Sequence, residues 1–257
     1  MEMVEQIDEA LWIADGEIVS FLGIPFPTRS VIVRLVGGDL WVWSPVRLAP
    51  DLRADLDRLG RVRHLVSPNK MHHLYLKDWS KAYPQAQLWG PQSTIRKCSD
   101  LKFREALEDH VPSDWGSDID LAWFRGSRAM DEIVFLHRPS RTVFVADLIA
   151  GFSDEFLRAH GGWWQLPLAR FLGMMADDYR APLDWRLSFL LVDRAPALAA
   201  RAKILSWGCE RVIMAHGEWR RADGHAFLER KLEWLGPNRS DTIIDGSPEV
   251  DSGPKLK

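Results

Sequence analysis

The fold is decided by the stretch His64-Leu65-Val66-Ser67-Pro68-Asn69-Lys70-Met71-His72-His73, which joins a short apolar strand to a turn and two histidines. Proline and asparagine favour a turn directly after the strand. Leucines at helical spacing predict a helix over 51–59, and further along we expect a helix over 77–83 and a strand over 87–89. Helices that alternate with strands are typical of an α/β layered fold.

Further strands are predicted on both sides of this region. Two β-rich runs, 31–36 and 40–44, flank the turn Gly37-Gly38-Asp39 and predict a β-hairpin. Later in the chain we expect strands over 119–124, 132–137, 142–146 and 211–215, and helices over 195–207 and 225–235. The sequence therefore predicts a mixed α/β protein.

The composition argues against several classes of protein. The chain has 257 residues with 33 Lys and Arg against 36 Asp and Glu, whereas a nucleic-acid binder normally carries a basic surplus, so we expect no nucleic-acid partner. Only Cys98 and Cys209 are present, which excludes a disulfide framework and a cysteine-based zinc site and fits a reducing, cytoplasmic location. We see no signal peptide and no run near the ~20 apolar residues of a transmembrane segment. The oligomeric state is left open.

Three predicted strands lead into side chains that can bind a metal ion. The strand over 64–66 leads through a short loop to His72, the strand over 142–146 ends at Asp147, and the strand over 211–215 ends at His216. Imidazole and carboxylate groups are ligands of zinc and iron, and loops at strand ends commonly carry functional residues. For each residue the alternative is a strand cap or a core hydrogen bond.

Four stretches of the chain together resemble a known protein family. They are 67–73, 79–91, 132–147 and 215–217. In these stretches, and over about residues 7–235, the chain resembles the family called domain of unknown function 4336, a divergent branch of the metallo-β-lactamase fold. The resemblance implies an αββα sandwich with a metal site at one edge of its two sheets.

The metal-binding motif of that superfamily is incomplete in this chain. Its usual form is His-x-His-x-Asp-His after a strand. With His72 as the final histidine, the earlier motif positions fall on Ser67, Asn69 and Met71. The superfamily's next histidine, expected near Arg128, is absent as well. The resemblance therefore does not support a site for two metal ions.

The remaining matches imply a smaller site. Asp147 matches the superfamily's bridging carboxylate and His216 its last histidine, so with His72 they form a set of two histidines and one carboxylate. Such a set suits one zinc or iron ion with open positions. We expect at most one ion per chain, and a chain without any metal is the alternative.

Three further residues are candidates for orienting these ligands: Asn69, His73 and Glu132. Each also has a plainer interpretation. Asn69 is a natural turn residue after proline, His73 is expected to face solvent, and Glu132 is expected to be an exposed strand residue. The plainer interpretation is the preferred one for all three.

A segment rich in aromatic residues, 151–191, is expected as a helical insert over the site. Its candidates for the wall of a substrate pocket are Trp163, Trp164 and Trp185, and Arg180 is the candidate for contact with an anionic group. The alternative is a lid that only packs on the sandwich. With this insert, we expect residues 1–237 to form one metallo-β-lactamase-like domain and 238–257 a disordered tail.

The leading hypothesis for function is a metal-dependent, hydrolase-like enzyme that acts on a small-molecule substrate. In this hypothesis Asp147 is catalytic as well as a ligand, because it orients or deprotonates a water molecule. Two alternatives stay open. One is a non-catalytic relic of the fold that binds a small ligand, and the other is a mononuclear-iron redox protein.

Overall fold

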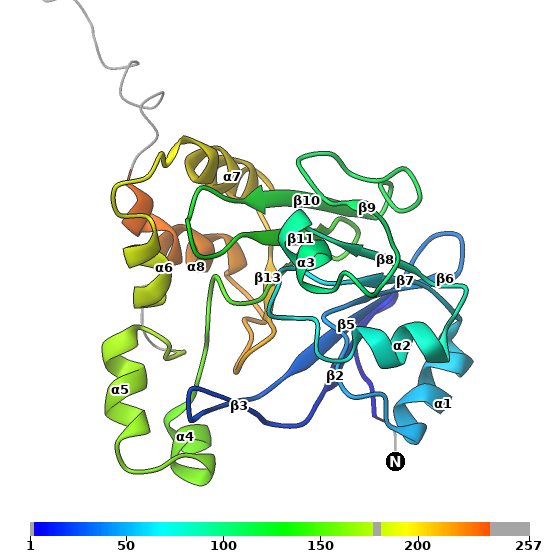
Figure 1. Ribbon diagram of the computed structural model, residues 1–257, viewed down its shortest axis with the longest axis horizontal. Coiled ribbons are helices and arrows are strands. Elements are labelled where there is room, and N and C mark those ends of the chain that lie inside the picture. The colour runs from blue at the N-terminus through cyan, green and yellow to red at the C-terminus, as the bar shows by residue number, and fades with distance from the viewer. Residues whose placement is uncertain (1–2, 177–180, 237–257) are drawn as a thin grey trace, which may run out of the picture.

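The computed structural model describes residues 3–176 and 181–236, which form two β-sheets flanked by helices (Figure 1). The larger sheet, in spatial order, contains β1 (Glu5–Asp8), β2 (Leu11–Asp15), β5 (Arg29–Arg34), β6 (Asp39–Trp43), β7 (Arg61–Val66), β8 (Gln87–Gly90) and β9 (Phe103–Ala106). The smaller sheet contains β10 (Ile119–Phe124), β11 (Glu132–His137), β12 (Thr142–Val145) and β13 (Arg211–Met214). A separate hairpin pairs β3 (Val19–Phe21) with β4 (Ile24–Phe26).

Helices connect the strands and cover the outer faces of both sheets (Figure 1). In the described ranges they are α1 (Pro50–Leu59), α2 (Leu76–Ala82), α3 (Gln92–Lys97), α4 (Asp154–His160), α5 (Gln165–Leu172), α6 (Leu183–Ser188), α7 (Ala195–Ser206) and α8 (Gly224–Lys231), followed by a 3₁₀ turn at Glu233–Leu235. None of these helices combines the length and the hydropathy that crossing a membrane requires.

The side-chain pattern of β6 shows how the layers are built. Successive side chains of a strand point to opposite faces. Trp41 and Trp43 therefore join the apolar core between the two sheets, whereas Leu40 and Val42 join an outer cluster that contains Leu52 of α1. The smaller sheet has a matching outer cluster that includes side chains of α7 and α8. The fold is an αββα sandwich, as expected.

Most of the predicted elements agree with the structure. The four predicted strands from 119 to 215 match β10–β13 to within one residue, and Gly38 turns the predicted hairpin at a φ of 83°. The elements that were not predicted are β1, β2, the short β3–β4 hairpin, β9 and α3. Arg180 and the expected tail, 238–257, lie outside the described residues.

Parallel pairing brings four strand ends to one edge of the sandwich. In the larger sheet β6 pairs in parallel with β7, and in the smaller sheet β12 pairs in parallel with β13. The loop after β7 is tied to the smaller sheet, because the Ile133 backbone N–H donates to the Pro68 carbonyl at 2.8 Å. Residues that follow these four strands therefore meet at the same edge.

Candidate metal centre

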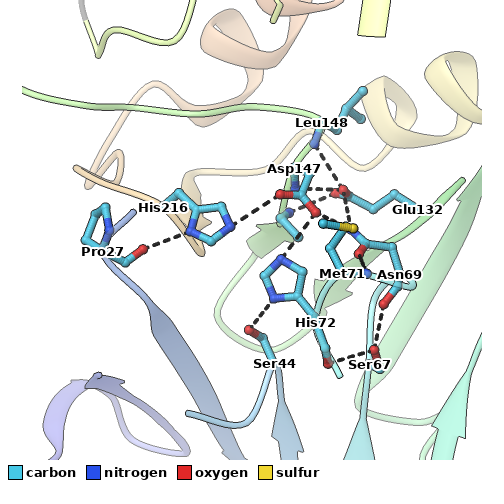
Figure 2. A network of polar contacts seen from close by, with 11 residues as sticks. Pro27, Ser44, Ser67, Asn69, Met71, His72, Glu132, Asp147, Leu148 and His216 are labelled. Atoms are coloured by element: carbon cyan, nitrogen blue, oxygen red, sulfur yellow. Dashed lines mark hydrogen bonds and ion pairs between the residues drawn. The ribbon is translucent and has the colours of Figure 1, made fainter. Parts of the chain in front are cut away.

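Three side chains from three strand ends converge at this edge. His72 follows β7, Asp147 follows β12 and His216 follows β13. One ligand atom from each residue lies within 4.8 Å of the others. Nε2 of His72 is 3.4 Å from Asp147 Oδ2, and Nε2 of His216 is 3.3 Å from Asp147 Oδ1. Figure 2 shows the two rings on either side of the carboxylate, each with a nitrogen toward it.

The ring of His216 is fixed by a backbone carbonyl. Its Nδ1 lies 2.8 Å from the carbonyl oxygen of Pro27, which can only accept a hydrogen bond. Nδ1 therefore carries a proton, and in the neutral ring Nε2 presents a lone pair to the Asp147 carboxylate. A lone pair facing a carboxylate is unfavourable unless a positive charge, either a proton or a metal ion, lies between them.

The ring of His72 is held in an equivalent way. Its Nδ1 is 2.8 Å from the Ser44 hydroxyl, and its ring stacks on Trp43 with centroids 6.2 Å apart. Its Nε2 is buried and, apart from its 3.4 Å approach to Asp147 Oδ2, has no hydrogen-bonding partner among the described residues. A buried polar atom without a hydrogen bond is costly in an interior, so this nitrogen has the features of a ligand atom.

Asn69 fixes the carboxylate of Asp147. Its amide nitrogen donates to Asp147 Oδ2 at 2.8 Å and to Glu132 Oε2 at 3.2 Å. Its carbonyl oxygen accepts the backbone N–H of Met71 at 2.8 Å. The side chain is therefore bonded through both ends, which makes it a positioning group for Asp147 as well as a turn residue (Figure 2).

Glu132 is fully buried, so the preferred expectation of an exposed strand residue was wrong. Its carboxylate accepts the backbone N–H groups of Ala146 and Asp147 at 2.8 Å and of Leu148 at 3.0 Å. Burial and the nearby Asp147 carboxylate raise the pKa of Glu132, whereas these three N–H groups lower it. The net result is a pKa of about 7. Glu132 thus holds the chain that carries Asp147.

The electrostatics of the centre favour a positive charge next to Asp147. Burial raises the pKa of Asp147, but the His72 and His216 imidazoles outweigh burial and hold that pKa well below its usual range. Burial lowers the pKa of His216, but Asp147 and the Pro27 carbonyl outweigh it and raise the pKa. A divalent ion can supply this positive charge, and two imidazoles with one carboxylate are a donor set that fits zinc or iron.

A pocket of about 360 Å³ opens above the three residues. Of the residues that the structure describes, its lining includes none of the three tryptophans expected as a wall. Trp185 is buried between Phe124 and Phe189, Trp164 is exposed, and Trp163 is 91% exposed. The segment 151–191 reaches the pocket instead through Met174, Pro182 and Asp184.

Several residues at the site were missed by sequence reasoning. Ser44 and Pro27 hold the histidines, and Lys97 and Asp184 line the pocket. His73, expected to face solvent, is half-buried and also lines the pocket. No local motif marks Ser44 or Pro27, because their role depends on a strand and a loop that the fold brings to the histidines.

Comparison of the chain with models of known protein families shows the family to which it belongs. The model of the family described as "Domain of unknown function (DUF4336)" matches residues 8–160, which is more than half of the chain. The chain belongs to the DUF4336 family. The match includes His72 and Asp147, whereas His216 lies beyond it. No curated protein matches this DUF4336 chain.

Solved structures show which fold this DUF4336 protein shares. A metallo-β-lactamase from Pontibacter korlensis matches with a TM-score of 0.58 and 12% identity, covering 91% of this chain and 99% of that chain. One from Hirschia baltica matches with a TM-score of 0.58 and 13% identity, covering 91% and 98%. The metallo-β-lactamase FIM-1 from Pseudomonas aeruginosa, in its mono-zinc form, has a TM-score of 0.58 and 15% identity, covering 90% and 93%. The DUF4336 chain therefore has the metallo-β-lactamase fold.

Proposed function

We propose that this protein is a metal-dependent, hydrolase-like enzyme that acts on a small molecule with one metal ion at His72, Asp147 and His216. The observation that carries the proposal is the convergence of two Nε2 atoms and one carboxylate at the floor of a pocket. In both histidines the other ring nitrogen is held by a separate partner. The shared fold supports the same reaction class, since the similar structures are metallo-β-lactamases.

The loop after β7 supports a single metal ion rather than two. At two positions where the superfamily motif has histidines, this chain has Ser67 and Asn69. The Ser67 hydroxyl donates to the backbone carbonyls of Asn69 at 2.8 Å and His72 at 2.9 Å. The amide of Asn69 is engaged with Asp147 and Glu132. Because both side chains already have partners within the loop and the site, we propose no second metal position.

Each residue then has a defined task. His72, Asp147 and His216 would hold a zinc or iron ion, which acts as a Lewis acid and lowers the pKa of water toward ~7. Asp147, fixed by Asn69, can also accept a hydrogen bond from a water molecule and so orient it toward the substrate. Ser44 and the Pro27 carbonyl keep the imidazole rings in place.

The proposal also covers the domain organisation, the location and the partner of the enzyme. We propose one metallo-β-lactamase-like domain over residues 1–237 and a cytoplasmic location. Cys98 and Cys209, both buried free thiols, support a reducing compartment. The partner that we propose is a small-molecule substrate.

Asp147→Asn is expected to lower hydrolysis by at least about 100-fold, because it removes both a charged ligand and a water-orienting group. The measurement is the hydrolysis of a panel of chromogenic esters, lactones, β-lactams and phosphodiesters by the zinc- or iron-supplemented chain. Glu105→Gln, which changes an exposed carboxylate on β9, serves as the matched control and should leave the rate unchanged. Rates equal in the Asp147→Asn variant and the wild type would contradict the proposal.

A further inference from the structure

The walls of the pocket above the proposed metal centre are formed largely by apolar side chains from several parts of the chain. The β3–β4 hairpin contributes Val19 and Phe21, and the loop after His72 contributes Leu74. Met130 and Met174, from two further segments, also line the pocket. Methionine side chains are flexible and polarisable, so they adapt to apolar ligands of different shape.

The pocket is also lined by polar residues, which besides the three proposed metal ligands are Ser20, Thr28, Ser44, His73, Tyr75, Lys97 and Asp184. The floor has His72, Asp147 and His216. Lys97 lines the pocket with an exposed side chain. The hydroxyl of Tyr75, another lining residue, is already hydrogen-bonded to Glu17. A largely apolar surface with a limited number of polar groups is typical of sites that hold the apolar part of a ligand and orient its reactive end.

Two apolar side chains extend this surface to the mouth of the pocket. Phe21 is 47% exposed and Leu74 is 59% exposed, and both line the pocket. Leu22, next to Phe21 at the tip of the hairpin, is 84% exposed. Grouped exposed apolar side chains beside a pocket are typical of a ligand-binding surface.

We propose that the pocket receives a hydrocarbon or aromatic group, and that the substrates are small amphipathic molecules whose hydrolysable bond lies next to this group. The volume of about 360 Å³ falls in the range of roughly 300–1,000 Å³ that small-ligand pockets occupy. That the ligand is hydrolysed rests on the proposed function, whereas the apolar walls are a property of the pocket itself.

The reaction expected for an ester of this class is ordinary hydrolysis. The oxygen of water forms a bond to the carbonyl carbon, and the bond between that carbon and the alcohol oxygen breaks. One proton of water passes to the leaving alcohol, so that an acid and an alcohol are released. The apolar group lies in the pocket, and the carbonyl lies at the floor beside Asp147.

A chain-length series tests the inference. With the full-length, zinc-supplemented protein, kcat/KM should rise at least about tenfold from p-nitrophenyl acetate through the butyrate to the octanoate, because each buried methylene favours binding. Leu74→Asn should lower kcat/KM for the octanoate by roughly threefold to tenfold, which is a larger loss than for the acetate. Val36→Asn, at an exposed position in the β5–β6 turn and absent from the pocket lining, is the matched control.

Binding of an uncharged dye separates the inference from the proposed function. Nile red fluorescence should report binding to the wild type and to His72→Ala alike, with weaker binding to Leu74→Asn and displacement by octanol. Dye binding at this site without hydrolysis of any ester, lactone, β-lactam or phosphodiester of the panel would overturn the proposed function and support the apolar pocket. Ester hydrolysis without chain-length preference and without dye binding would overturn the inference and leave the proposed function standing.

Discussion

Glu132→Ala is expected to destabilise the fold by about 3 kcal/mol or more. The substitution leaves the backbone N–H groups of Ala146, Asp147 and Leu148 without their acceptor. Each buried donor that loses its partner costs about 1–3 kcal/mol. The same change frees the loop that carries Asp147, so metal affinity should fall together with stability.

The measurement for Glu132 is urea denaturation followed by tryptophan fluorescence. Glu132→Gln keeps the volume and one carbonyl acceptor, so it should lose less stability than the alanine variant. Glu105→Gln, on the exposed side of β9, should be close to neutral. A loss below about 1 kcal/mol for Glu132→Ala would show that the carboxylate does not organise this loop.

Gly217→Ala is expected to cost more than about 2 kcal/mol and to displace His216. Gly217 has a φ of 93°, in the region where side chains other than glycine are strained. An added Cβ would lie 2.1 Å from the carbonyl oxygen of Gly151, which is backbone and cannot move aside alone. That segment is also bonded to the His216 carbonyl through the Gly151 N–H at 3.0 Å.

The matched control for this variant is Gly37→Ala. In the described structure no atom beyond Gly37 and its two chain neighbours lies within 4 Å of the position that a Cβ would take at Gly37. The control should therefore change stability by less than about 0.5 kcal/mol. Thermal denaturation and metal binding should both separate the two variants, and equal behaviour of Gly217→Ala and Gly37→Ala would refute the argument from close packing.

The part of the fold that the sequence predicted is the part with strong local signals. The runs that became β10 to β13 are bounded by turns and rich in β-branched and aromatic residues, so their limits were predicted to within one residue. β2 has four buried residues in succession and no alternation, and β3 and β4 have three residues each. Such short or uniformly buried strands carry little periodic signal.

The candidate site was predictable only where a residue followed a predicted strand directly or through a short loop. His72, Asp147 and His216 met this condition, and the structure places them together. Glu132 was misjudged because its partners are backbone N–H groups at positions 146–148, in the turn that follows the neighbouring strand β12. The tryptophans of 151–191 were misjudged because aromatic content does not show which face of an element meets the pocket.

The central claim is one metal ion at His72, Asp147 and His216, and zinc titration tests it most directly. Isothermal titration calorimetry of the metal-free full-length chain with Zn²⁺ measures both stoichiometry and affinity, and circular dichroism confirms that each variant is folded. We predict one ion per wild-type chain and a loss of at least about 100-fold in affinity for folded His72→Ala, because such a site depends on each of its three protein ligands. Two tightly bound ions per chain, or binding unchanged in His72→Ala, would contradict the account.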